Sequence, residues 1–242
     1  MLEGLYAAAA GMQAQQQQVD AIANDIANAD TPGYQAQIVG FHDLLYTTGG
    51  YGSNVATGAG SAAQVVGRSQ TPGSIQETGQ PLDVAINGDG YLEVRRPDGT
   101  IGLSRDGELQ TDGQGRLTNQ QGMLLQPPIA LPSGVPQSEV TISANGTVTV
   151  PGRTLGKLNL VTVANPDGLL ADGDSLFSAT AASGPIRASS TATLQQGALE
   201  SSNVDLGTEM SKMIEAQQNY SMGSQAVQFQ DQLLQIANQI KP

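Results

Sequence analysis

The side chains that could carry catalytic or metal chemistry are few in this chain of 242 residues. It contains no Cys, which excludes disulfides, thiolate metal sites and a cysteine nucleophile. His42 is the single histidine, and no Ser and acid lie near it at the spacing of a known catalytic triad. We therefore expect a structural or surface role for His42, and we expect neither a metal nor a cofactor.

Paired carboxylates are the remaining catalytic option, because a glycosidase needs only two of them. Five acids in the Gly-rich middle of the chain are candidates: Asp83, Asp89, Asp98, Asp106 and Asp112. All but Asp83 precede a glycine, and tight turns require such Asp-Gly pairs in any case. Turns are the favoured interpretation, and a secreted carbohydrate-active β protein is the alternative from the class of enzymes.

Calcium, phosphate and nucleic-acid sites are also disfavoured. The acids of Asp167–Asp174 and the run Asn87–Gly90 do not fit the spacing of an EF-hand loop. The glycines Gly58 and Gly60 are not followed by the Gly-Lys of a phosphate-binding loop. The net charge of -12 argues against nucleic acid as a partner, because phosphate binding needs clustered Lys and Arg.

The elements that would position any site follow from composition. Residues 1–29 and 199–240 lack Pro and contain few Gly, which is compatible with helices, whereas residues 31–198 are rich in turns. Asp-Gly pairs between short apolar runs predict β hairpins. Residues 47–64 are rich in Gly, Ser and Ala and predict an extended or mobile loop. The predicted strands are Leu82–Ile86, Tyr91–Arg95, Gly115–Thr118, Val140–Ser143, Thr147–Val150 and Leu155–Val163.

Apolar residues recur every seven positions in both terminal zones, which returns them to nearly one helix face. The second zone has three such rows, which together span roughly 160° of the helix surface. Asp205 is the expected N-cap of that helix, and the turn at residues 30–33 should end the first helix near Ala29. The rows and their neighbours supply the predicted subunit interface: Leu5, Met12, Val19, Ile22, Ile26, Leu206, Met213, Tyr220, Val227, Phe229, Leu233, Leu234, Ile236 and Ile240.

An apolar face this wide exceeds the seam of a two-stranded coiled coil. If the two helices paired only with each other, part of the face would stay exposed, and exposed apolar area of that size usually marks an interface. The sequence therefore favours a self-associating structural protein over an enzyme. A helical hairpin packed on its own domain is the alternative that the residues leave open.

The first residues, Met1-Leu2-Glu3-Gly4, lack the basic charge and long apolar run of a secretory signal peptide. We also expect no membrane insertion, because no run of 18 apolar residues occurs. Two interpretations remain open, which are a cytosolic protein and a protein exported by a route that reads an uncleaved N-terminus.

Three segments, in order, resemble the bacterial flagellar rod and hook protein family. They are residues 22–34, residues 81–107 with Pro81-Leu82-Asp83 and Ser104-Arg105-Asp106-Gly107, and residues 197–217 with the run Leu199-Glu200-Ser-Ser-Asn203-Val204. The likeness covers nearly the whole chain. The positions that match the family motifs are Asn24, Asn28, Thr31, Gly33, Tyr34, Leu82, Asp83, Arg105, Leu199, Glu200, Asn203 and Val204.

The resemblance implies an α+β fold in which long N- and C-terminal helices pair like a coiled coil and flank a central, mostly antiparallel β domain. The implied domains are a helical assembly domain (1–34 and 199–242), an extended Gly-rich linker (35–80) and a β domain (81–198). Family members are structural rather than enzymatic. They polymerise into the axial shaft of the flagellar basal body, which transmits torque from motor to hook.

The implied partners are other copies of the chain, neighbouring rod and hook proteins, and the flagellar export apparatus, which passes subunits across the cell envelope without a cleaved signal. The segment Phe41–Tyr46 is most similar to the distal rod members, in which an extra segment here is implied to stiffen the rod. Proximal rod and hook-type members are the alternatives within the family.

Overall fold

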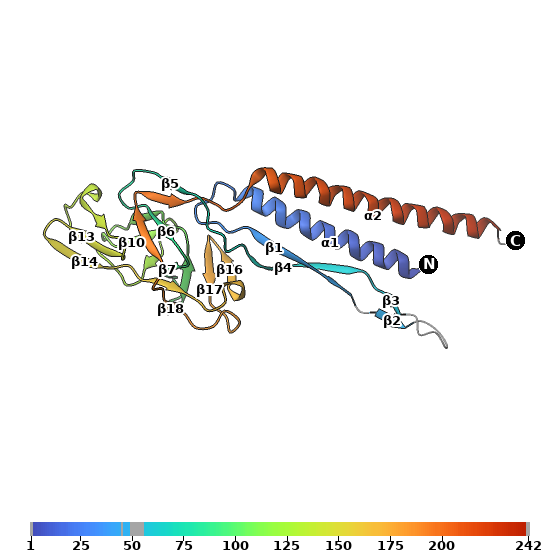
Figure 1. Cartoon of the computed structure of the whole chain (residues 1–242), viewed down its shortest axis with the longest axis horizontal. Coiled ribbons are helices and arrows are strands. Elements are labelled where there is room, and N and C mark those ends of the chain that lie inside the picture. The colour runs from blue at the N-terminus through green and yellow to red at the C-terminus, as the bar shows by residue number, and fades with distance from the viewer. Residues whose placement is uncertain (1, 45, 49–55, 241–242) are drawn as a thin grey trace. The chain divides into compact units, whose positions relative to one another are not determined.

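The computed structural model describes residues 2–44, 46–48 and 56–240 and divides into two compact units (Figure 1). The helical unit comprises residues 1–27, 37–66 and 205–242, and the β unit comprises residues 28–36 and 67–204. The predicted class is confirmed, with an N-terminal helix, a mostly antiparallel β region and a C-terminal helix. None of the helices in the described part of the chain has the length and apolarity needed to cross a membrane.

The helical unit is built on α1 (Leu2–Ala27) and α2 (Leu206–Ile240), which lie side by side and antiparallel (Figure 1). Their backbones approach closely at two points along the pair. A Cβ placed on Gly4 would lie 2.8 Å from Nε2 of Gln230, and one placed on Gly223 would lie 2.8 Å from Cγ of Met12. Small residues therefore set the spacing of the two helices.

Helix α2 begins at the predicted N-cap. Oδ1 of Asp205 accepts hydrogen bonds from the amides of Gly207 (2.9 Å) and Thr208 (3.4 Å), and Oδ2 accepts one from the Thr208 hydroxyl (3.1 Å). These bonds, that of the hydroxyl first, hold the pKa of Asp205 below its ordinary value. Asp205 thus satisfies amide donors that the first turn of a helix leaves unpaired.

A long β hairpin completes the helical unit. Strand β1 (Gln37–Asp43) pairs with β4 (Ser61–Arg68), and β2 (Tyr46–Thr48) pairs with β3 (Ala56–Gly58). The start of β1 is fixed to α1, because both carboxylate oxygens of the buried Asp25 accept from the Gln37 amide at 3.1 Å. The expected open loop at 47–64 is thus largely paired strand, and the part of it at 49–55 lies outside the described residues.

The β unit contains a nine-stranded antiparallel sheet, a three-stranded sheet and two strand pairs. The large sheet follows the order β16-β17-β8-β7-β11-β10-β9, with β15 on β7 and β18 on β15, while β12-β13-β14, β19-β6 and β20-β5 form the rest. The strand bounds are β5 Ile75–Glu77, β6 Val84–Asn87, β7 Tyr91–Arg95, β8 Ile101–Ser104, β9 Leu109–Thr111, β10 Leu117–Asn119, β11 Leu124–Leu125, β12 Thr141–Ile142, β13 Thr147–Val150, β14 Arg153–Lys157, β15 Leu160–Thr162, β16 Leu170–Gly173, β17 Leu176–Ser178, β18 Arg187–Ala188, β19 Thr193–Gln196 and β20 Ala198–Glu200. Short 3₁₀ turns lie at Gln137–Glu139 and Pro166–Gly168.

The core of the β unit is aliphatic, as expected for a chain without Trp. Buried Leu, Ile and Val side chains from β6, β7, β10, β13 and neighbouring segments form its main cluster. A smaller cluster contains an aromatic pair, Tyr91 and Phe177, whose ring centroids lie 5.8 Å apart in an edge-to-face arrangement. Such pairs prefer this geometry because the positive ring edge meets the negative face.

Three predicted strands exist with shifted or shorter bounds: Leu82–Ile86, Gly115–Thr118 and Val140–Ser143 correspond to β6, β10 and β12. A fourth is wrong in a larger way. Leu155–Val163 was expected to be continuous, but the structure divides it into β14 and β15. Strand β14 pairs with β13, whereas β15 pairs with β7 and β18, so the chain changes sheets at Leu158 and Asn159. Apolar residues on both sides of this step are buried, which is why the sequence reads as a single run. The predicted strands Tyr91–Arg95 and Thr147–Val150 are confirmed at both ends.

The close approach of the helices predicts different effects for two glycines. Gly11→Ala should stabilise α1 by about 1 kcal/mol, because Ala is the better helix former and nothing lies within 4 Å of the new Cβ. Gly223→Ala should stabilise its helix by at least about 1 kcal/mol less than Gly11→Ala does, because the new Cβ would clash with the side chain of Met12. Thermal loss of helix, followed by circular dichroism of both variants, measures the difference. Equal gains would contradict this packing.

Candidate assembly surface and chain junction

On the outer side of α2, apolar side chains of the predicted rows are exposed to solvent. Met222, Phe229 and Ile236, spaced by seven residues, are 60%, 61% and 53% exposed, and Leu233 beside them is 45% exposed. Exposed apolar side chains of this size, repeating along a helix, form a continuous strip. We call the strip formed by Met222, Phe229, Leu233 and Ile236 the outer row.

A different set of residues on α2 faces α1. Ala216 is buried, Met213, Gly223 and Val227 are half-buried, and the polar Gln230 lies against Gly4. Most side chains of α2 that face α1 are therefore smaller or more polar than those of the outer row. Among the other predicted interface residues of α2, Leu206 and Tyr220 are exposed, while the side chains of Leu234 and Ile240 lie outside the described residues.

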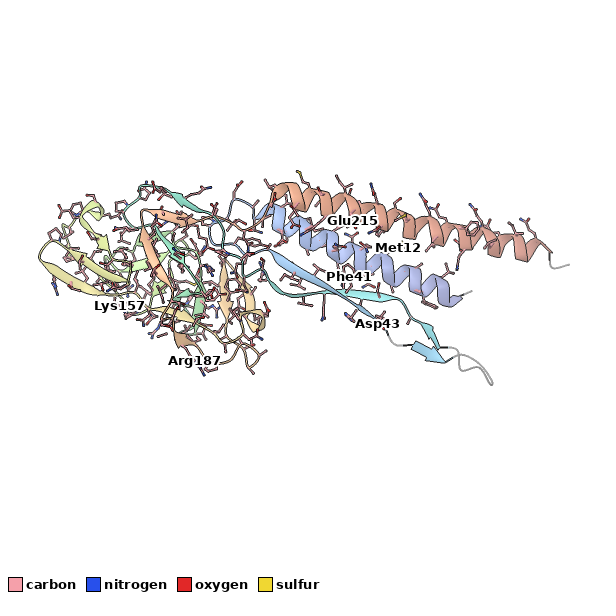
Figure 2. The ribbon with its side chains drawn as sticks, in the orientation of Figure 1. Met12, Phe41, Asp43, Lys157, Arg187 and Glu215 are labelled. Atoms are coloured by element: carbon pink, nitrogen blue, oxygen red, sulfur yellow. The ribbon has the colours of Figure 1, made fainter. Side chains whose placement is uncertain are left out.

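The predicted residues of α1 pack mostly inside the helical unit. Ile22 is buried, whereas Leu5, Met12, Val19 and Ile26 are half-buried. Figure 2 shows Met12 between the two helices and Glu215 on α2. The hairpin adds exposed apolar side chains on β1 and β4, which are Ile38, Phe41, Val65 and Val66, and His42 is exposed on β1.

Ion pairs play a small part on the helix surfaces, because cations are scarce there. The sequence of the helical unit contains only two cations, Lys212 and Lys241. Lys212 is already paired, with Nζ 2.7 Å from Oε1 of the buried Glu209. The outer row is therefore suited to apolar contact rather than to an ion-pair network.

Several of the family-motif residues come together within the β unit, close in sequence to its connections with the helical unit. Four peptide bonds join the two units, at 27/28, 36/37, 66/67 and 204/205. Inside the β unit, the chain next to these bonds forms three segments, 28–36, 67–74 and 197–204, which hydrogen-bond to one another. We call these three segments the junction.

A buried ion pair anchors the junction to the β sheet. Nε of Arg105 lies 3.0 Å from Oε2 of Glu200, and the two side chains are 2% and 4% exposed. The other carboxylate oxygen of Glu200 accepts from the Gly73 amide (3.0 Å), and Nη2 of Arg105 donates to the Gly88 carbonyl (3.1 Å). Both charges thus have extra hydrogen-bond partners, which a buried pair needs to offset desolvation.

The turn after α1 fits into this anchor by close backbone contact. Gly33 donates its amide to the Glu200 carbonyl at 2.8 Å. It has a φ of +66°, and a Cβ there would lie 2.6 Å from the carbonyl carbon of Arg105, so another residue would be both strained and obstructed. Tyr34 follows, and the guanidinium of Arg68 lies 5.1 Å from its ring centroid.

Asn203 uses its whole polar group within the junction. Its Oδ1 accepts from the Ala36 amide (2.7 Å), and its Nδ2 donates to the carbonyls of Ser69 (3.1 Å) and Thr71 (2.8 Å). Its own amide donates to the Tyr34 carbonyl at 3.3 Å. The sequence offered Asn203 only as a motif position, and its bonds to Ala36, Ser69 and Thr71 were not foreseen.

The remaining family-motif positions lie in local structure. Asn28 and Thr31 form the turn that ends α1, with the Thr31 hydroxyl 3.2 Å from Oδ1 of Asn28, and Asn24 accepts from Gln37 Nε2 at 3.2 Å. Leu82 and Asp83 are buried before β6, and Leu199 and Val204 are half-buried. Sequence reasoning missed Asp25, whose burial opposite β1 could not be read from its polar type.

The structure places the candidate catalytic acids in structural surroundings. Asp98 and Asp112 are turn acids that bind nearby amides, and Asp89 is exposed. Asp83 and Asp106 are buried, and Oδ2 of Asp83 accepts the Thr78 hydroxyl at 2.6 Å. A cleft of about 680 Å³ in the β unit is lined by Glu93, Lys157 and Arg187 instead. Figure 2 labels these two cations, both of which are exposed.

An uncovered apolar helix row and a hydrogen-bonded junction define a structural assembly protein. Comparison with known proteins agrees. The family described as flagella basal body rod protein matches residues 5–35, the flagellar hook protein FlgE/F/G D1 domain matches residues 85–150, and the flagellar basal body rod FlgEFG protein C-terminal matches residues 195–240.

Relatives match over the full length. The chain is 37% identical to the flagellar basal-body rod protein FlgG of Borreliella burgdorferi, covering 100% of this chain and 99% of that protein. It is 36% identical to FlgG of Caulobacter vibrioides (99% and 100%) and 34% identical to the rod protein FlgF of Escherichia coli (90% and 90%). The chain belongs to the flagellar basal-body rod protein family, as its motifs predicted.

Burial beside the junction gives Asp106 an unusual titration. Desolvation, followed in effect by the nearby carboxylates of Glu108 and Asp83, raises its pKa from 3.8 to about 6, although the Glu108 amide donates to Oδ1 at 3.0 Å. Because the folded-state pKa is the higher one, this side chain favours folding fully below about pH 4, and the contribution is lost as the pH rises through about 6.

Asp106→Asn keeps the acceptor oxygen and removes the charge. We expect it to raise the free energy of unfolding by about 1–3 kcal/mol at pH 7.5 and to leave it nearly unchanged at pH 4. Urea unfolding at both pH values measures this. The matched control is Asp98→Asn, which should not stabilise at pH 7.5, because bonds from Thr100 lower the pKa of Asp98. A gain for Asp106→Asn that is equal at both pH values would contradict the electrostatic cause.

Proposed function

We propose that this chain is a structural subunit of the flagellar basal-body rod, of the distal type. In this proposal the subunits polymerise through their terminal helices into the shaft that carries torque from motor to hook. The observation that carries the proposal is the outer row of α2, with Met222, Phe229 and Ile236 more than half exposed. Full-length likeness to several rod proteins named FlgG supports the same role.

The energy for assembly comes from burying the outer row. Removing a large apolar side chain from water is worth about 1.5–3 kcal/mol. Several such side chains on each copy are enough to favour association after the cost of ordering. The inner sides of α1 and α2 pair like a coiled coil in this proposal, and the outer row is covered by the helices of neighbouring copies.

A helical shaft requires contacts between unlike surfaces. When one surface of a copy meets a different surface of the next copy, the assembly grows as an open filament unless the rotation between copies closes it into a ring. The exposed side chains of the hairpin, Ile38, Phe41, Val65 and Val66, offer such a second apolar surface, on strands that lie along α1 rather than α2. This supports an open polymer over a closed dimer.

The partners follow from this role. The ends of the rod must contact other rod and hook proteins, and the subunit must reach the growing tip through the flagellar export apparatus without a cleaved signal. The segment at Phe41–Asp43, which continues into the hairpin, supports the distal type over the proximal rod or hook types. No enzymatic activity is part of the proposal.

The outer row predicts a sharp assembly defect. Phe229→Asp should abolish rod assembly and swimming, because a carboxylate would have to be buried among apolar side chains of neighbouring copies. The folded monomer should be little affected, because Phe229 is 61% exposed. Swimming in soft agar, electron microscopy of basal bodies and thermal unfolding of the purified chain measure the three parts.

The matched control is Gln228→Asp, which adds the same charge one residue away at an exposed polar position. It should assemble and swim normally. If Phe229→Asp also swims normally, the outer row is not the assembly surface. If both variants fail equally, added charge on α2 rather than loss of the apolar contact is responsible, and the proposal is again contradicted.

A further inference from the structure

We propose that Asn203 is a mechanical tie that locks the three junction segments together, so that load entering the β unit is shared among its four covalent connections. The inference rests on the proposed function, because only a torque-bearing subunit needs such sharing. Neither the family matches nor the names of the relatives assign this role to any residue.

The connectivity makes the junction a bottleneck. Ala36 ends the first segment immediately before the hairpin leaves the β unit, and Ser69 lies two residues after Gly67, where the hairpin returns. Asn203 lies in the third segment, two residues before α2 begins its cap at Asp205. Each of the three segments therefore ends or begins at a connection that would transmit force.

One carboxamide bonds to the other two segments at once. Oδ1 accepts from Ala36 in the first segment, while Nδ2 donates to Ser69 and Thr71 in the second. A further bond, from the Ser69 amide to the Ala36 carbonyl at 2.8 Å, closes the ring between those two segments. The tie is therefore short and rigid, because each bond of the carboxamide ends on a backbone atom rather than on another mobile side chain.

The chemistry calls for Asn at this position. An amide side chain supplies an acceptor and two donors, whereas a carboxylate only accepts. Asp at residue 203 would keep the bond from Ala36 and would face the two carbonyls of Ser69 and Thr71 with negative charge. Ser would be too short to reach both segments. The orientation of the carboxamide is fixed by this same pattern of one donor and two acceptors around it.

Other contacts of the third segment lie farther from the ends of the hairpin. Glu200 accepts from the amides of Gly33 and Gly73, and the Asn203 amide donates to the Tyr34 carbonyl. These contacts reach the first segment two or three residues before Ala36 and the second segment four residues after Ser69. The two ends of the hairpin, at Ala36 and Ser69, depend on Asn203 for their bond to the segment that leads into α2.

The experiment compares full-length chains carrying Asn203→Asp or Asn203→Ser with the control Asn145→Asp. Asn145 is a matched control because its side chain binds through Oδ1, which accepts from the Thr147 amide at 3.0 Å. An Asp carboxylate can accept the same bond. We expect hydrogen exchange at the Ala36 amide to accelerate about ten-fold or more in Asn203→Ser, which loses the bond to Oδ1, since a lost bond of ordinary strength has this effect. Exchange at the Ser69 amide, which donates to the Ala36 carbonyl, should accelerate in both Asn203 variants as the segments separate. Exchange at the Gly33 amide should stay unchanged, and the control should match wild type at every site.

The second measurement is the stiffness of rods isolated from cells. Rods built from the Asn203→Asp chain should have normal length, and their persistence length in micrographs should be about half that of wild-type rods or below. If Asn203 only stabilised the fold, the stiffness of the rods would be unchanged. Unaltered exchange at Ala36 and Ser69, or rods as stiff as wild type, would overturn the tie. If even Asn203→Ser unfolds the whole β unit, Asn203 is a folding residue and the tie is wrong. If the wild-type chain forms no rods, the proposed function fails, and the exchange result still decides the tie.

Discussion

The burial of α2 is incomplete within one chain, and the rest of the account depends on this. The close approach of α1 at Gly4 and Gly223 covers a narrow strip of small and polar residues on α2. It leaves the larger side chains, such as Phe229 and Met222, in contact with water. A helix of 35 residues has more apolar surface than one neighbour can cover. Covering this face would take contact with other molecules, and copies of the same chain are the partners that we propose.

The β unit has the opposite character. Its core is closed by its own strands, and the buried charges of Arg105 and Glu200 are paired within the unit. A closed core of this kind is what a unit needs to fold without neighbours. In the proposed function, this division suits a subunit that is exported before its helices are ordered in a polymer. The junction lies where the two requirements meet along the chain, because all four connections lead into it.

Local patterns in the sequence predicted the helices well, and distant contacts could not be predicted. The seven-residue repeats identified both helices, and the cap at Asp205 is confirmed by its bonds to Gly207 and Thr208. The repeats could not tell which row faces α1, because Val227 and Phe229 are equally apolar. Small residues such as Ala216 and Gly223 decide this, since they allow the helices to approach.

Local sequence patterns could not predict the hairpin or the junction, and the reasons differ. Strand β3 is Ala56-Thr57-Gly58, in a run rich in Gly, Ser and Ala with weak strand preference, and its pairing with β2 determines its structure. The junction joins residues far apart in sequence, such as Asn203 and Ala36. Motif resemblance marked Asn203 as important but gave no partner. Only the three-dimensional structure shows that its carboxamide spans two other segments.

Hydrogen exchange of α2 in the free chain and in assembled rods is the decisive test of assembly through the outer row. We predict fast exchange along residues 210–236 in the monomer and strong protection of the same amides in the rod, because in the proposed assembly only neighbouring copies cover the outer row. Amides of the β core, such as that of Leu103, should be protected in both states and serve as the reference. Equal protection of α2 in the monomer and in the rod would contradict the claim that assembly completes this helix.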